Sequence, residues 1–205
     1  MREVNRLQSK RIEIVGIAYS GSKFNIGIGM NNPTSNDRRC GDESLRRGRW
    51  SESGATYFLT LCTRDRREGL TRPEIATALR SELSSCEYDR HCRVSAGVIM
   101  PDHLHLLVEL TGALGLSRVV ARVKAKTRTV LNAVMIEWQS NFYEHRMRPD
   151  DPKAAVLRYI MLNPFRAGLI DEDEKYAWAW MHADEAQRFD SSAFDEGKLF
   201  PAWLQ

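Results

Sequence analysis

The sequence predicts an α+β sandwich in which helices cover one face of an antiparallel sheet. Three short β-rich runs occur at 57–62, 93–100 and 103–110, and the last two are separated only by Pro101 and Asp102. So short a connection favours an antiparallel pair of strands. Segments with helical periodicity lie between and after these runs, which is the element order expected of a sheet covered by helices.

The chain of 205 residues, 42% of them hydrophobic, is long enough for one globular domain with a sizeable core. We expect that domain at 46–171. The leader, 1–45, contains a polar passage rich in Gly and Asn without sustained periodicity, and we expect it to be poorly ordered. The C-terminal extension, 172–205, contains three tryptophans but no pattern that predicts a particular element.

Composition argues against several classes of protein. The four cysteines form no CxxC pair, which argues against a zinc ribbon and a disulfide framework; they are Cys40, Cys62, Cys86 and Cys92. The sequence shows neither a secretory segment nor an apolar run of membrane-spanning length, so we expect a soluble, cytoplasmic protein. A net charge of +3 is too small to identify an anionic partner.

The first predicted helix follows the first strand. Thr71 is its expected cap, Pro73 lies in its first turn, and Glu74 completes a capping box. Apolar residues then recur on one face, at Ile75, Leu79 and Leu83.

The second predicted helix begins at Ser117 and has an unusual charge pattern. Its valines are spaced for a core, and no acidic residue occurs between Gly112 and Ile136. Its basic residues are Arg118, Arg122, Lys124, Lys126 and Arg128. They form either a solvated face or a surface for phosphates, and the pattern alone favours neither.

The third predicted helix is short. Asp150 or Asp151 is its expected cap, Pro152 its start, and Asn163 its last residue before Pro164. An irregular stretch precedes it, with aromatic residues beside Arg146 and Arg148 that suit either unpaired bases and their phosphates or an ordinary core.

Two pairs of side chains could carry chemistry. His103 and His105 share one face of a strand, as metal ligands do, although two such histidines are more often a structural pair. Tyr159 and Asn163 are four residues apart in a helix, so a phenol and an amide share a face. The alternative is a packed aromatic residue and a helix stop.

The ordered set "MPDHLHLLVEL", "WQSNFYEHRMR" and "LRYIMLNPFRAGLI", after "GATYFLTLCTRDRR", resembles the REP-associated tyrosine transposases. These are single-tyrosine HUH endonucleases related to small insertion-sequence transposases. The resemblance covers about 46–170 and implies a ferredoxin-like sandwich. It also shows Asp102 where Asn usually precedes the first histidine.

The resemblance implies a function for each pair. His103 and His105 would ligate Mg²⁺ or Mn²⁺ with help from Asn163, and Tyr159 would attack a phosphate of single-stranded DNA. The product would be a 5′-phosphotyrosine link and a free 3′-hydroxyl. The expected substrates are hairpins of repeated extragenic palindromes, which would place the protein at the nucleoid, with a monomer favoured and a dimer possible.

Contacts to that DNA are expected from Arg122, Lys126, Arg146 and Arg148. Two other functions remain open at this point. The chain could be a domesticated protein that binds hairpins without cutting them, or an unrelated metal phosphodiesterase in which water replaces the tyrosine.

Overall fold

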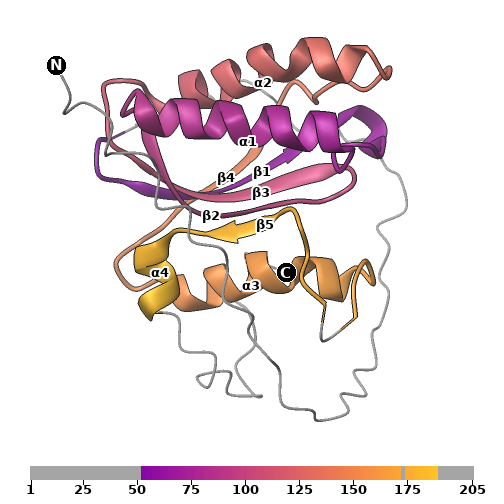
Figure 1. Ribbon diagram of the computed structural model, residues 1–205. Coiled ribbons are helices and arrows are strands. Elements are labelled where there is room, and N and C mark those ends of the chain that lie inside the picture. The colour runs from indigo at the N-terminus through magenta and orange to yellow at the C-terminus, as the bar shows by residue number, and fades with distance from the viewer. Residues whose placement is uncertain (1–51, 172–173, 189–205) are drawn as a thin grey trace, which may run out of the picture.

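The computed structural model describes residues 52–171 and 174–188, so the leader expected at 1–45 lies outside the described residues. A five-stranded antiparallel sheet with the order β4-β1-β3-β2-β5 forms its centre (Figure 1). The strands are β1 (Thr56–Cys62), β2 (Cys92–Ile99), β3 (His103–Leu110), β4 (Tyr143–Arg146) and β5 (Ala179–Met181). The helices are α1 (Pro73–Tyr88), α2 (Leu116–Asn132), α3 (Lys153–Arg166) and α4 (Ala183–Arg188). Within these residues no helix is both long enough and apolar enough to cross a bilayer.

The α+β sandwich is confirmed, but the expectation that helices cover only one face is wrong. Figure 1 shows α1 and α2 on one side of the sheet and α3 with α4 on the other. The reason is that the inner strands bury side chains on both faces: in β3, Leu104 to Val108 are all buried. A sheet that is apolar on both faces needs a helical layer on each.

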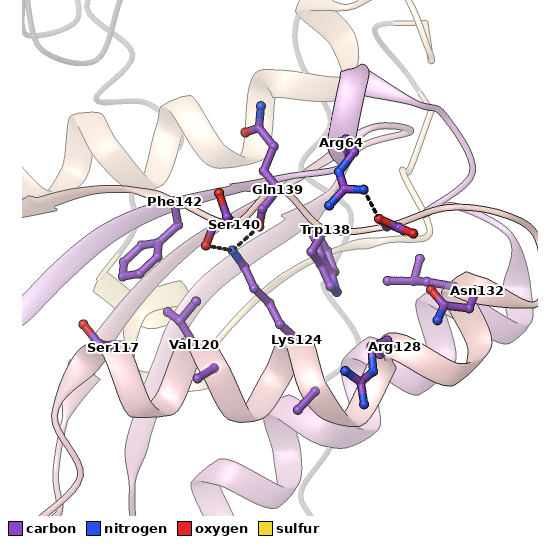
Figure 2. A pocket seen from close by; sticks show the side chains of 14 residues that line it. Arg64, Ser117, Val120, Lys124, Arg128, Asn132, Trp138, Gln139, Ser140 and Phe142 are labelled. Carbon is purple, nitrogen blue, oxygen red and sulfur yellow. Dashed lines mark hydrogen bonds and ion pairs between the residues drawn. The ribbon is translucent and has the colours of Figure 1, made fainter. Parts of the chain in front are cut away.

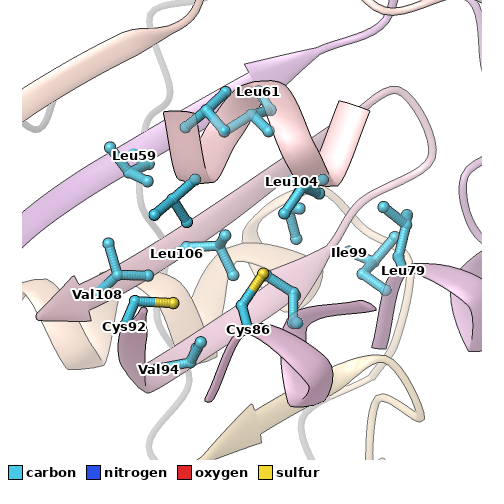
Figure 3. Close-up of a cluster of buried hydrophobic side chains, with 14 of the residues drawn as sticks. Leu59, Leu61, Leu79, Cys86, Cys92, Val94, Ile99, Leu104, Leu106 and Val108 are labelled. Carbon is cyan, nitrogen blue, oxygen red and sulfur yellow. The ribbon is translucent and has the colours of Figure 1, made fainter. Parts of the chain in front are cut away.

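The larger core lies under α1 and α2. Leu59 and Leu61 of β1 and Leu104 and Leu106 of β3 point into it, against Leu79 of α1 (Figure 3). The second core lies under α3, where Phe58 and Leu107 of the sheet meet Val156, Leu157 and Ile160. Alternate residues of one strand therefore supply two different cores.

The helix starts differ from the sequence-based expectation. No capping box forms at α1, because Arg72 is the N-cap and no side chain bonds the free backbone N–H groups there. At α3 the N-cap is Pro152, again without a side-chain bond, because Asp151 accepts hydrogen bonds from the Arg148 backbone N–H and from His145 instead.

The end of α3 also differs. Pro164 lies inside the helix, which continues to Arg166. Proline removes one hydrogen-bond donor and usually ends or kinks a helix. Here the last turn is closed by backbone N–H groups after the proline, with Ala167 N donating to Asn163 O at 3.0 Å and Leu169 N to Pro164 O at 2.9 Å.

The segment expected as an extension beyond 171 completes the sheet. β5 pairs with β2, and Trp180 lies opposite Gly97. The indole covers Gly97 so closely that a Cβ there would lie 2.6 Å from Trp180 Cη2 and 2.8 Å from Leu106 Cδ2. A strand of three residues is too short to show periodicity, which is why the sequence pattern did not reveal it.

This contact yields a prediction for stability. We expect Gly97→Ala to lower the free energy of unfolding by about 1–3 kcal/mol, because the added methyl group forces Trp180 away from β2. Urea unfolding of four proteins measures it: the wild type, Gly97→Ala, Trp180→Ala and the double variant. Gly97→Ala should lower the free energy of unfolding by less when Trp180 is already alanine. An equal loss in both backgrounds would show that Trp180 is not the obstacle.

Candidate active site

Two histidines of β3 face α3. His103 and His105 alternate with Leu104, whose side chain lies in the core under α1 and α2. Their own side chains therefore lie on the Phe58 side of the sheet. The strand register places Cys62 opposite His103 and Thr60 opposite His105.

Each imidazole is held by a polar neighbour through Nδ1. His103 Nδ1 lies 2.6 Å from Asp102 Oδ1, and His105 Nδ1 lies 2.9 Å from Thr60 Oγ1. The two Nε2 atoms are left facing each other at 3.1 Å. Bonds at Nδ1 fix the orientation of a histidine whose Nε2 binds a metal.

Burial favours the neutral form of both imidazole rings. It lowers the pKa of His105 to about 3, and the positive charge of Arg66 acts in the same direction, as would a protonated His103. Burial also lowers the pKa of His103, although the Asp102 carboxylate opposes this effect. Neutral imidazoles have the lone pair that a metal ion requires.

This donor pair fits one divalent metal ion. In the tautomers that donate Nδ1–H to Asp102 and to Thr60, both Nε2 lone pairs point to the same place, and neither Nε2 has a proton to donate to the other. Two ligands about 2.1 Å from one ion and at right angles to each other are separated by about 3 Å. The described part of the chain contains no group of three His, Cys, Asp or Glu side chains suited to a metal, so a third protein ligand from that part would be of another type.

Tyr159 lies beside the second histidine. Its ring centroid is 5.4 Å from that of His105 and 5.9 Å from that of Phe58, and both contacts are edge-on. Phe58 stacks on His105 at 5.3 Å and meets Tyr143 edge-on at 6.3 Å. Phe58 therefore packs against both His105 and Tyr159 and helps to set the spacing between them.

Two further residues of α3 share the side of Tyr159. Asn163 follows it by four residues and Arg166 by seven, spacings that lie on one helix face. The Arg166 guanidinium lies 5.2 Å from the centre of the Tyr159 ring, a cation–π contact. Asn163 is half-buried, and its role as a metal ligand stays a prediction.

The start of α3 is anchored by α4. Lys153 Nζ lies 2.5 Å from Glu185 Oε1, and Ser95 Oγ of β2 donates to the same oxygen at 3.3 Å. Glu185 is almost fully buried. A buried carboxylate with these partners ties the tyrosine helix to the sheet within one chain.

The residues expected to contact DNA are spread over the molecule. Arg122 is bonded to Glu82 of α1 and to Asp89, which directly follows α1, with both distances below 3 Å, so it joins the two helices. Lys126 is exposed on α2. Arg146 pairs with Glu52, and Arg148 is exposed just after β4.

A groove of about 510 Å³ lies between α2 and the segment 137–142. Figure 2 shows Lys124 reaching from α2 to this segment, where its Nζ donates to the carbonyl oxygens of Gln139 and Asn141 at 2.8 Å each. Burial lowers the pKa of Lys124 to about 8. The groove lies on α2, on the side of the sheet away from α3, so it is distinct from the histidine site.

Sequence reasoning missed the supporting residues of the site. Thr60, Phe58 and Arg66 contact the site across strands or loops. They lie within the quoted stretch "GATYFLTLCTRDRR", but nothing in that stretch indicated which of its residues would face the histidines. Asp102 carried one available signal: it precedes His103 directly and has a carboxylate where an amide is more usual in the resembled family.

The chain is similar to known transposases. The family described as "Transposase IS200 like" matches residues 51–161. A REP-associated tyrosine transposase of Escherichia coli K12 is 26% identical over 141 residues, which cover 68% of this chain and 84% of that protein.

A solved structure supports the same assignment. It is described as the REP-associated tyrosine transposase bound to a REP hairpin, and it matches with a TM-score of 0.58 and 25% identity over 69% of this chain and 85% of that one. The similarity of the sheet and of the sequence confirms the resemblance found in the motifs. The family match spans more than half of the chain, and the chain therefore belongs to the IS200-like transposase family.

Proposed function

We propose that the protein is a metal-dependent endonuclease and strand transferase for single-stranded DNA, acting on hairpins of repeated palindromes through Tyr159. The main support is the position of Tyr159, whose ring centre lies 5.4 Å from that of His105. His103 and His105 also direct their Nε2 atoms at one point. The solved relative that matches this chain is bound to such a hairpin, which supports the choice of substrate.

The chemical step is a transesterification. The phenol oxygen of Tyr159 forms a bond to phosphorus, the bond from phosphorus to the 3′-oxygen breaks, the phenol proton is released, and the 3′-oxygen gains a proton. The products are a 5′-phosphotyrosine and a free 3′-hydroxyl. One phosphodiester replaces another, so the reverse attack by a 3′-hydroxyl rejoins strands without a separate energy source.

His103 and His105 would hold Mg²⁺ or Mn²⁺, with Asn163 as the further ligand. The ion would polarise the phosphate and favour the ionised phenol. The protein's own part is positional: Phe58 fixes the tyrosine ring, Thr60 fixes His105, and Arg166 brings a positive charge to the face of Tyr159.

All of these side chains come from one chain. α3 packs on the histidine face of its own sheet and is anchored there by Lys153 and Glu185. This anchoring of α3 on its own sheet supports the proposal that a monomer is the acting species.

The rival function is a hairpin-binding protein that no longer cuts. The convergence of the histidines with Tyr159 favours the enzyme, because binding alone requires neither paired Nε2 atoms nor a nearby phenol.

The first prediction concerns Tyr159. We expect Tyr159→Phe to abolish the covalent protein–DNA adduct, because the attacking oxygen is lost while the ring packing against Phe58 and His105 is kept. The probe is an end-labelled oligonucleotide with a hairpin and unpaired flanks from a repeat of the host genome, incubated with Mn²⁺ and run on a denaturing gel. Hairpin binding, measured by fluorescence anisotropy, should be retained.

The matched control is Tyr143→Phe, the same change at a tyrosine that is 46% exposed and also contacts Phe58. It should leave the adduct intact. An undiminished adduct with Tyr159→Phe would exclude Tyr159 as the nucleophile. Cleavage without any adduct in the wild type would favour the phosphodiesterase, and binding without cleavage would favour the rival function.

The second prediction concerns the metal ligands. We expect replacement of both His103 and His105 by alanine to abolish cleavage and also the binding of Mn²⁺. Electron paramagnetic resonance measures the Mn²⁺ binding. His182→Gln is the control, since that histidine contacts Arg93 at the far edge of the sheet. Metal-independent cutting by the double variant at the wild-type rate would make the pair structural.

The third prediction separates the basic residues of α2. Lys126→Gln should weaken hairpin binding and reduce the slope of log K against log salt by about 1, because a phosphate contact releases counterions. Arg122→Gln should instead lower the midpoint of urea unfolding, because it breaks the bonds to Glu82 and Asp89. An unchanged slope with Lys126→Gln would exclude a phosphate contact by Lys126.

A further inference from the structure

We propose that Arg66 and Asp102 form a positioning pair that presents His103 to the metal, an inference that rests on the proposed function of the histidines. Asp102 accepts two short contacts, one at each carboxylate oxygen. Oδ1 lies 2.6 Å from His103 Nδ1, and Oδ2 lies 2.7 Å from Arg66 Nε. Charge-assisted bonds of this length are among the stronger hydrogen bonds in proteins.

The backbone of Asp102 is fixed separately from its side chain. The Thr63 N–H donates to Asp102 O at 2.9 Å. The hydroxyl of Thr63 lies 3.0 Å from the same oxygen and 2.8 Å from Arg67 O, and Thr63 is fully buried. These bonds tie the turn between β2 and β3 to the end of β1. They fix the backbone from which the Asp102 carboxylate extends.

Arg66 reaches Asp102 from an unusual backbone. Asp65 and Arg66 both have a φ of 55°, the left-handed region that residues other than glycine seldom occupy. Two such residues in succession persist only where surrounding contacts hold them, and they are often found near functional sites. The contacts here are Arg66 Nε to Asp102 and Arg66 Nη1 to Cys62 Sγ at 2.9 Å.

The pair has a direct effect on His103. A carboxylate at Nδ1 retains the proton there, so Nε2 keeps its lone pair directed at His105 Nε2. Side-chain exposure is only 13% for His103 and 18% for Asp102, so water competes little for this bond. Carboxylate partners of this kind orient a ligating histidine and increase its basicity.

Arg64 offers a matched control. It belongs to the same 3₁₀ turn, Arg64–Arg66, and also forms an ion pair, with Glu137, but this pair lies in the groove beside α2 and touches neither histidine. Arg64→Gln therefore breaks an ion pair of the same type in the same turn.

The experiment measures Mn²⁺ affinity by electron paramagnetic resonance in the wild type, Asp102→Ala, Asp102→Asn, Arg66→Gln and Arg64→Gln. We expect Asp102→Ala to weaken binding by about 10–100-fold. Asp102→Asn keeps an acceptor oxygen without its charge, so we expect a smaller loss of Mn²⁺ affinity. Arg66→Gln should reduce the affinity by about as much as Asp102→Asn does. Arg64→Gln should bind as the wild type does.

A second readout needs no metal. ¹⁵N NMR of the imidazoles should show His103 protonated at Nδ1 in the wild type and a mixture of tautomers in Asp102→Ala. Thermal unfolding of each variant separates loss of the fold from loss of orientation, and Asp102→Asn keeps the shape of the side chain if alanine unfolds the turn.

The outcomes are distinct. Wild-type affinity and an unchanged His103 tautomer in Asp102→Ala would overturn the positioning pair while leaving the proposed function intact. Absence of Mn²⁺ binding by the wild type would overturn the proposed metal site, and the tautomer measurement would then decide alone whether Asp102 and Arg66 orient His103.

Discussion

The packing of α3 against the Phe58 side of the sheet is the contact on which the rest of the site depends. Val156, Leu157 and Ile160 bury one side of the helix against β2 and β3, and this fixes the helix rotation. The same rotation brings Tyr159 to His105. The apolar residues that stabilise the fold therefore also set the distance between Tyr159 and the histidines, so α3 cannot move without disturbing both.

The parts of the fold that could be predicted from sequence were those with sustained periodicity. Alternation of apolar residues predicts β3 and the common face of His103 and His105. Helical spacing of apolar residues predicts α1 and α2. The ordered motifs predicted the family, and the family match over residues 51–161 confirms it.

The remaining features depend on tertiary contacts. β4 and β5 are too short for a pattern, and a sheet that is apolar on both faces does not reveal which helix covers which face. Thr71 and Asp151 had the right residue types for caps, but Asp151 is bonded to Arg148 and His145 instead. Thr60 and Arg66 lie beside the histidines only after the strands pair.

The two helical layers have a geometric consequence. The exposed Lys126 on α2 and Tyr159 on α3 lie on opposite sides of the sheet, which has only two edges, β4 and β5. A nucleic acid that touched both surfaces would have to pass around one of those edges. The shortest path between the two surfaces would then be at least as long as the protein is thick at that edge.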